Sequence, residues 1–165
     1  MIFETERLLI RKLILEDLEP FHKMESNPKV LKYATGKVKT LAENKEELKD
    51  LVAKYNTLKN DFCIYAIERK SDNNFIGTVA LVKDNLDDEI GYRFLEKYWN
   101  NGYGFEICGG LINYCKQIKM FKIIGYVVDK NIASAKILEK YHFKKIETKI
   151  NTDLQLTETK YELYL

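Results

Sequence analysis

The chain has 165 residues, of which 45% are hydrophobic and 32% charged, a composition typical of one soluble globular domain. Lys and Arg outnumber Asp and Glu by only 27 to 25, which argues against broad electrostatic binding of nucleic acid or of an anionic membrane. No stretch approaches the roughly 18 consecutive apolar residues of a membrane-spanning helix, and the charged N-terminus is unlike a signal peptide. We therefore predict a cytoplasmic protein with no nucleic-acid or membrane partner.

The cysteines are sparse and odd in number, and they lack the CxxC spacing of zinc sites: Cys63, Cys108 and Cys115. This pattern argues against a disulfide framework and against a structural metal site, so we predict no metal. Cys108 and Cys115 are seven residues apart on one face of a predicted helix. We expect both to be buried as small hydrophobic residues.

In the N-terminal half, periodicity and turn residues predict strands and helices in alternation. A strand over residues 8–13 precedes a helix over residues 16–25, which Asn27-Pro28 ends. A short helical turn follows, and a longer helix is predicted over residues 42–58. Strands over residues 62–68 and 75–82, joined by a polar turn, form a predicted hairpin.

In the C-terminal half, a polar loop over residues 83–88 leads to a strand over residues 89–94. A glycine-containing turn then opens a helix over residues 103–119, and a strand over 122–128 and a helix over 131–141 follow. Two further strands, over residues 143–150 and 159–165, complete the chain. The order predicts an α+β fold with a central, mixed, mostly antiparallel sheet of about seven strands.

The turn between the fourth strand and its helix, WNNGYG, is the most informative segment. A strand that leads through glycines into a helix N-terminus presents unpaired backbone N–H groups at the positive end of the helix dipole, which favours phosphate. The spacing and the Lys of a P-loop are absent. The dinucleotide pattern G-x-G-x-x-G also fails, because Ile107 stands where the third glycine would be. The third possible pattern for a phosphate site is present: an x-x-G-x-G turn followed by a helix, a strand and an Asn-led helix.

That order of motifs resembles the GNAT superfamily of N-acetyltransferases, in particular the branch of ribosomal-protein N-terminal acetyltransferases. The matching segments run nearly from end to end: Thr5–Arg11, Phe75–Gly77, Glu89–Tyr92, Tyr98–Gly104 and Asn131–Ser134. The resemblance implies a single GNAT domain over residues 1–165. It also implies helices on both faces of the sheet and strands that splay apart between the fourth and the fifth.

The resemblance implies acetyl-CoA as the acyl donor, bound mainly by the backbone. It assigns the pantetheine arm and the acetyl carbonyl to the backbones of Tyr92, Arg93 and Phe94. It assigns the Asn131 side chain to the pantetheine arm, with Ser134 beside it. The pyrophosphate would be held by the amides of Asn100, Asn101, Gly102, Tyr103, Gly104 and Phe105. An amide directed at the acetyl carbonyl would stabilise the negative charge that develops there.

Transfer to an amine also needs proton transfer, because an alkylamine such as Lys, with a pKa of ~10.4, is mostly protonated at neutral pH. We expect Glu89 to be the general base. Family members often supply a Tyr seven residues beyond the Asn as the acid, but that position here is Leu138. Ser134 is the better candidate for the acid, since Tyr141, expected on the same helix face, lies one turn further along.

The first hypothesis is therefore an enzyme that acetylates a primary amine, with a protein N-terminus favoured by the branch resemblance. Acetylation of a small amine (a polyamine, an aminoglycoside or an amino acid) is the alternative, although the sequence shows no acidic cluster other than Asp87-Asp88-Glu89. A non-catalytic acyl-CoA-binding protein on the same fold is a third possibility, which Leu138 supports. A nucleotide-binding oxidoreductase is disfavoured, and both a monomer and a homodimer remain open.

Overall fold

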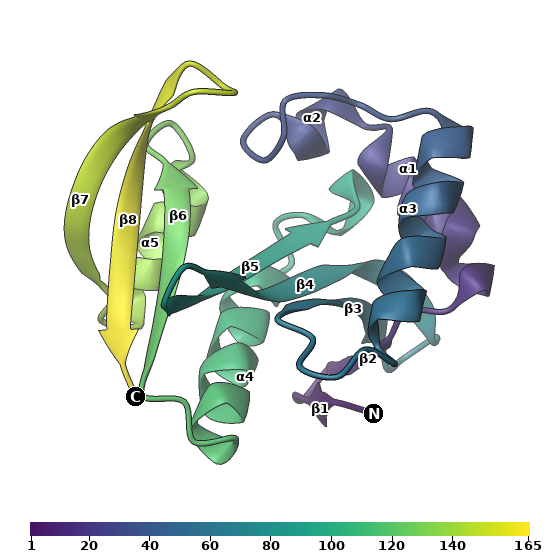
Figure 1. Ribbon diagram of the computed structural model, residues 1–165, viewed down its shortest axis with the longest axis horizontal. Coiled ribbons are helices and arrows are strands. Elements are labelled where there is room, and N and C mark those ends of the chain that lie inside the picture. Colours follow the sequence, from purple (N-terminus) through teal and green to yellow (C-terminus); the bar gives the residue numbers. More distant parts are fainter.

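The computed structural model describes residues 1–165 and contains one eight-stranded sheet flanked by helices (Figure 1). The strands lie in the order β1-β2-β3-β4-β5-β6-β8-β7. The strands are β1 (Phe3–Glu4), β2 (Leu8–Lys12), β3 (Phe62–Arg69), β4 (Asn74–Asp84), β5 (Asp87–Phe94), β6 (Lys122–Val128), β7 (Lys144–Asn151) and β8 (Leu156–Tyr164). The α-helices are α1 (Leu18–Glu25), α2 (Pro28–Leu31), α3 (Leu41–Lys54), α4 (Tyr103–Gln117) and α5 (Ile132–Lys140), and two short 3₁₀ turns span Leu15–Asp17 and Glu96–Tyr98.

The sheet is antiparallel everywhere except between its two central strands, β5 and β6. These run parallel and are in register at a single pair, Glu89 opposite Ile124. Beyond that pair the two strands separate, so the remaining backbone groups on the β6 side of β5 have no strand partner. The splay expected between the fourth and fifth strands is confirmed, and it leaves an opening in the middle of the sheet.

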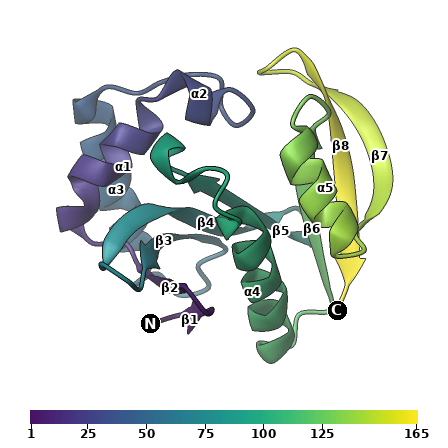
Figure 2. The same ribbon diagram turned by 180° about the vertical axis from the view of Figure 1, so that it is seen from behind.

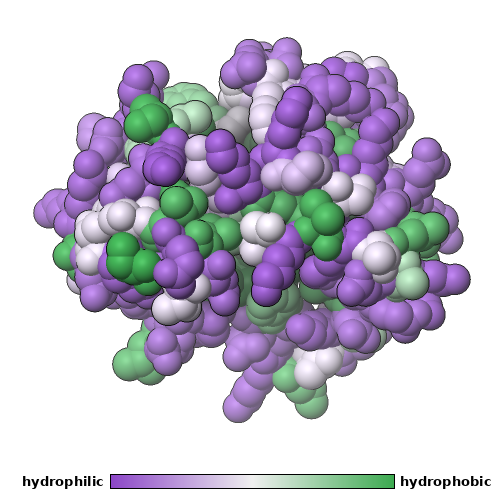
Figure 3. All heavy atoms as spheres, turned by 90° about the horizontal axis from the view of Figure 1, so that it is seen from above, coloured by the Kyte–Doolittle hydropathy of each residue, from purple (hydrophilic) through white to green (hydrophobic).

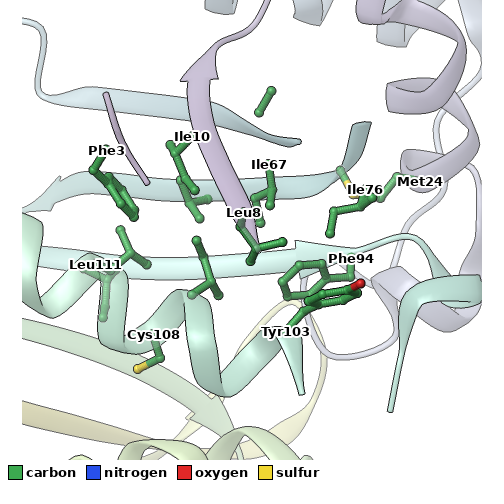
Figure 4. Close-up of a cluster of buried hydrophobic side chains, with 14 of the residues drawn as sticks. Phe3, Leu8, Ile10, Met24, Ile67, Ile76, Phe94, Tyr103, Cys108 and Leu111 are labelled. Carbon is green, nitrogen blue, oxygen red and sulfur yellow. The ribbon is translucent and has the colours of Figure 1, made fainter. Parts of the chain in front are cut away.

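Helices cover both faces of the sheet, as expected. α1 and α3 lie on one face and α4 and α5 on the other, as the two opposite views show (Figures 1 and 2). A continuous apolar core fills the space beneath α4, where Leu8, Ile76, Phe94 and Leu111 meet (Figure 4).

Three element boundaries differ from the sequence expectation. The sheet has one strand more than the expected seven, because Phe3–Glu4 pairs with β2. The expected loop over residues 83–88 is instead part of a tight β4–β5 hairpin, since cross-strand pairs such as Lys83 with Asp88, 2.7 Å apart, stabilise polar strand ends. The predicted helix over residues 42–58 ends at Lys54.

The cysteines behave as predicted. Cys108 and Cys115 lie under α4 and are fully buried, and burial raises the pKa of each thiol to about 12. All three cysteines are free thiols. No helix has the length and apolar content to cross a membrane, and no three His, Cys, Asp or Glu side chains gather as metal ligands would.

Candidate active site

The segment between β5 and α4 forms a pocket of unpaired backbone N–H groups. Gly102 caps α4 in the left-handed conformation, with φ of 79°, a backbone geometry that glycine adopts without strain. The amides of Asn100, Asn101 and Gly102 donate to no protein acceptor. Those of residues 103–105 belong to the first turn of α4 and have no intrahelical acceptor. The predicted anion-binding geometry is therefore present at this turn.

Two side chains, Trp99 of the turn itself and Arg7 from the N-terminal segment, hold the turn in place. The Trp99 indole Nε1 donates to the Phe94 carbonyl oxygen at 2.9 Å, which ties the turn to the end of β5. The Arg7 guanidinium donates to the Asn101 carbonyl oxygen at 3.0 Å and pairs with the Glu106 carboxylate at 2.6 Å. The N-terminal segment before β2 thus braces the turn from behind, a role that the sequence did not reveal.

A cleft of about 640 Å³, here called the turn cleft, opens in front of these amides. Ten of the eleven residues predicted to bind the donor line it, and its size suits a ligand of cofactor dimensions. The ten are Tyr92, Arg93, Phe94, Asn100, Gly102, Tyr103, Gly104, Phe105, Asn131 and Ser134. Asn101 is the exception, because its side-chain amide turns inward to the carbonyls of Tyr98 and Trp99, at 3.1 and 2.8 Å.

The far wall of the turn cleft is α5. Asn131 caps this helix, because its Oδ1 accepts a hydrogen bond from the Ser134 backbone N–H at 3.3 Å. The Asn131 Nδ2 group makes no hydrogen bond within the protein and is free to donate to a ligand. A Cβ at Gly104 would lie 3.1 Å from Ile137 Cδ1, so α4 and α5 approach closely at this point. The two helices can approach this closely because residue 104 lacks a side chain.

A second cleft, of about 340 Å³, lies on the opposite face of the sheet, between β3–β5 and the helices α1 and α3. We call it the carboxylate cleft, because Glu25, Glu47, Glu89 and Glu158 line it and Arg93 is its only basic residue. Apolar side chains form much of the rest of its wall. Figure 3 views the molecule from above and shows apolar residues near the middle of the surface on that side, with hydrophilic residues around them.

The two clefts meet at the splay of the sheet. Six residues line both: Tyr33, Ala34, Tyr92, Arg93, Asn131 and Ser134. A molecule in the turn cleft and a molecule in the carboxylate cleft would therefore touch at this junction. The arrangement can bring two reactants together from opposite faces of the sheet.

The structure places Glu89 in the carboxylate cleft, on the third residue of β5. Burial raises the pKa of its carboxyl to about 7, and the neighbouring carboxylates of Asp84 and Glu158 add to the rise. A carboxyl that titrates near neutral pH can take a proton from an amine and release it to water. The sequence placed Glu89 at this strand, but it did not reveal the burial or the facing carboxylates.

The sequence did not reveal the three other acidic residues of this cleft. Glu25 of α1, Glu47 of α3 and Glu158 of β8 are far apart in the chain, and only the fold brings them together. The sequence has no run of acidic residues that joins these positions, so the gathering of carboxylates in this cleft becomes visible only in the fold. The one available signal was the spacing of Glu25 four residues beyond the buried Phe21, which places it on the inward face of α1.

The structure separates two residues that were expected on one face of α5. Leu138 is buried and lines the carboxylate cleft. The Tyr141 hydroxyl instead donates to the Phe105 carbonyl oxygen at 3.0 Å, and its ring stacks on Phe105, because Tyr141 ends the helix and turns toward α4. Tyr141 therefore lies outside both clefts, whereas the Ser134 side chain lies at their junction.

With this geometry in view, the comparison with known families gives a clear result. The family model described as "Acetyltransferase (GNAT) domain" matches residues 7–144, most of the chain. The chain therefore belongs to the GNAT acetyltransferase family and is an acetyl-CoA-dependent N-acetyltransferase.

Individual proteins are similar to this chain over most of its length. The N-acetyltransferase YoaA of Bacillus subtilis is 29% identical over 153 residues, which cover 87% of this chain and 83% of YoaA. The protein YkkB of the same organism is 25% identical, with 94% of each chain covered.

Solved structures share the fold. A GNAT-family acetyltransferase from Bacillus anthracis superposes with a TM-score of 0.84 at 24% identity, over 98% of this chain and 97% of the other. RimL, a ribosomal L7/L12 alpha-N-protein acetyltransferase solved in complex with coenzyme A, superposes with a TM-score of 0.83 at 14% identity, over 98% and 96%. At these identities the likeness is one of fold, and it confirms the architecture inferred from the sequence.

Proposed function

We propose that this protein, acting as a single domain over residues 1–165, transfers an acetyl group from acetyl-CoA directly to a primary amine at the junction of the two clefts. The observation that carries the proposal is the shared set of junction residues, because it joins an amide-lined donor cleft to an acid-lined cleft. Direct transfer needs both reactants in contact, and most of the rate would come from holding them in that position.

The donor side would act through the backbone. The unpaired amides of residues 100–105 would hold the pyrophosphate of CoA, helped by the positive end of α4. The backbone groups of Tyr92, Arg93 and Phe94 on the open edge of β5 would bind the pantetheine arm and the acetyl carbonyl. The free Nδ2 of Asn131 would donate to the same arm. These roles require no cationic side chain at the pyrophosphate.

The proton transfers would fall to two side chains. As the bond between the amine nitrogen and the acetyl carbon forms, the amine proton would pass to Glu89, directly or through one water. As the carbon–sulfur bond breaks, the Ser134 hydroxyl at the junction would pass a proton to the leaving thiolate while it takes one from a solvent water, so that Ser134 ends the step as a hydroxyl. Ser134 would take the role of the acid, because the apolar side chain of Leu138 cannot donate a proton.

The class of amine is the finer question. The branch resemblance favours a protein N-terminus, and RimL, a ribosomal L7/L12 alpha-N-protein acetyltransferase, shares the fold. Several other acetyltransferases share it too, including the microcin C7 self-immunity protein MccE, solved with acetyl-CoA and AMP at a TM-score of 0.80 and 13% identity. The fold therefore accommodates different acceptors, and the acceptor must be argued from the cleft itself.

The test is release of free CoA thiol from acetyl-CoA against a panel of peptide N-termini, polyamines, aminoglycosides and simple alkylamines. We expect turnover with at least one amine, and we expect it to fall in Ser134→Ala and Glu89→Gln. Tight CoA binding without turnover on any amine would contradict the proposal and would instead favour a non-catalytic acyl-CoA-binding protein.

A further inference from the structure

The carboxylate cleft holds more acid than one proton transfer needs. Its four carboxylates form two pairs on different walls. Glu89 and Glu158 belong to strands, whereas Glu25 and Glu47 belong to the helical wall of α1 and α3. The strand pair includes the proposed base. The helical pair has no role in the reaction as proposed above.

The helical pair contains two unsatisfied acceptors. Glu25 is only 3% exposed; its Oε1 pairs with Arg93 at 2.7 Å, and its Oε2 is buried without any hydrogen-bond partner. Glu47 Oε1 pairs with Lys39 at 2.7 Å, and its Oε2 is likewise buried and unpartnered. Buried polar atoms are almost always satisfied, so two orphan carboxylate oxygens on residues of one cleft indicate a missing donor. A ligand with an ammonium group would supply it.

The floor of the cleft is smooth and narrow between these acids. Gly91 of β5 stands opposite Ala80 of β4, and a Cβ added at Gly91 would meet only the Ala80 Cβ, at 3.7 Å. Small residues therefore leave a trough in the sheet surface between the positions of Glu89 and Arg93, which are four residues apart, or roughly 13 Å along the strand. Apolar side chains such as Ile64 and Leu51 line the same space and suit methylene groups.

The cleft is also covered at its outer end. A Cβ at Gly36 would lie 2.7 Å from Leu154 Cδ2, so the segment after α2 touches the β7–β8 turn. The two opposite views show these segments approaching each other over the opening (Figures 1 and 2). This contact restricts access by bulky groups and favours a slender acceptor.

We propose that the acceptor is a linear aliphatic diamine or polyamine, whose reacting amine lies at the junction and passes its proton to Glu89, and whose second ammonium group is bound by Glu25 and Glu47. This inference rests on the proposed function and specifies its substrate class. The methylene chain would lie along the Gly91 trough. A bulky aminoglycoside would need more width than a covered cleft of about 340 Å³ provides. A peptide with an uncharged side chain would offer the two orphan oxygens neutral N–H donors but no second positive charge.

The test compares spermidine with n-butylamine, which has an alkyl chain and a primary amine but no second charge, and with an uncharged tripeptide. Turnover is measured by thiol release, and binding to the CoA-saturated protein is measured by calorimetry. We expect kcat/KM for spermidine to exceed that for n-butylamine by about thirtyfold, equivalent to about 2 kcal/mol for one charge-assisted interaction.

The variant that tests the second ammonium site is Glu47→Gln, which keeps the shape of the side chain. It should reduce the preference for spermidine over n-butylamine, in both kcat/KM and affinity, by about tenfold. Glu46→Gln is the matched control, because Glu46 is exposed on the same helix and does not line the cleft; it should leave the preference unchanged.

The outcomes separate this inference from the proposed function. Turnover of n-butylamine or of the tripeptide at least as efficient as that of spermidine would overturn the inference and leave direct acetyl transfer standing. Spermidine binding that is weakened by Glu47→Gln, without turnover of any amine, would support the polyamine site and contradict the proposed function. Spermidine binding no tighter than that of n-butylamine would overturn the inference whatever the activity.

Discussion

The turn cleft and the carboxylate cleft are built in opposite ways. The turn cleft is formed mainly by one continuous stretch, from Tyr92 to Phe105, and it offers backbone N–H groups. The start of α5 and the α2 segment (residues 29, 30 and 32–34) complete its walls. The carboxylate cleft is assembled from α1, α3, β3–β6, α5 and β8, and it offers carboxylate side chains. One cleft is suited to an anionic ligand and the other to a cationic one.

This difference has a physical basis. A pyrophosphate can be held by amides whose positions follow from local chain geometry, so short-range sequence is sufficient to build the donor site. An acceptor is selected by side chains that must converge from separate elements. Substitutions in the two clefts should therefore have separable effects, on CoA binding in one and on the acceptor and its protons in the other.

Glu89→Gln should have the largest effect. Loss of the base should lower kcat/KM for the amine by about a hundredfold to a thousandfold at pH 8. Because burial raises the pKa of this carboxyl to about 7, the wild-type rate should also fall as the pH drops through about 7. The rate of the variant should not show this fall. A pH–rate profile with unchanged CoA affinity checks this, and an unaltered profile would exclude Glu89 as the base.

Glu89 should also influence folding. Because its pKa is raised in the folded state from 4.5 to about 7, the folded protein holds this proton more tightly than the unfolded chain does. Its contribution to stability is therefore complete below pH 4.5 and is lost as the pH rises through about 7. Glu89→Gln should remove this loss and raise the free energy of unfolding at pH 8, by at most about 3 kcal/mol. Urea unfolding at pH 5 and pH 8 measures it.

Ser134→Ala should act on the chemistry at the junction. Without the acid for the departing thiolate, kcat should fall about a hundredfold. The backbone N–H of residue 134 is retained, so the cap of α5 by Asn131 should persist and CoA affinity should change little. Steady-state kinetics with a CoA titration separates the effect on kcat from the effect on CoA affinity. A loss confined to KM would contradict the role of Ser134 as the acid.

Gly104→Val should weaken the turn cleft. The added side chain would meet Ile137 where α4 and α5 approach closely, which should reduce CoA affinity by about 2 kcal/mol, or about thirtyfold. Calorimetry with CoA measures this. Amine binding should change far less, so an equal loss of both would show that the clefts are not separable.

Gly91→Val tests the carboxylate cleft instead of the turn cleft. The side chain would project into the trough of the carboxylate cleft, where a Cβ meets only Ala80 at 3.7 Å, so the fold should tolerate it. We expect KM for the amine to rise about tenfold, equivalent to 1.4 kcal/mol, with CoA affinity unchanged. Unchanged kinetics would mean that the acceptor does not use this trough.

Asn131→Ala should have the smallest effect. Loss of the cap of α5 should cost about 1 kcal/mol of stability. Asn131→Asp is the control, because it keeps a capping oxygen and removes only the Nδ2 donor. If Asn131 binds the pantetheine arm, both variants should weaken CoA binding while only Asn131→Ala lowers the thermal midpoint.

By itself, the sequence determined the donor side of this protein. Strand periodicity, the glycines of the turn and the Asn-led helix predicted the α+β fold and the anion site, because each signal is local. The family resemblance carried by these motifs implied the splay and ten of the residues that line the turn cleft. The sequence did not predict the extra strand β1 or the full extent of the β4–β5 hairpin, since both depend on pairing with other strands.

Only the tertiary structure decided the acceptor side. Glu25, Glu47 and Glu158 have no shared motif, and their convergence on Glu89 depends on how α1, α3 and β8 pack around the opening in the sheet. The raised pKa of Glu89 has the same origin, because it is produced by burial and by facing charges rather than by chain neighbours alone. Local geometry specifies where the phosphate-bearing donor can be held, and long-range packing specifies which amine can meet it.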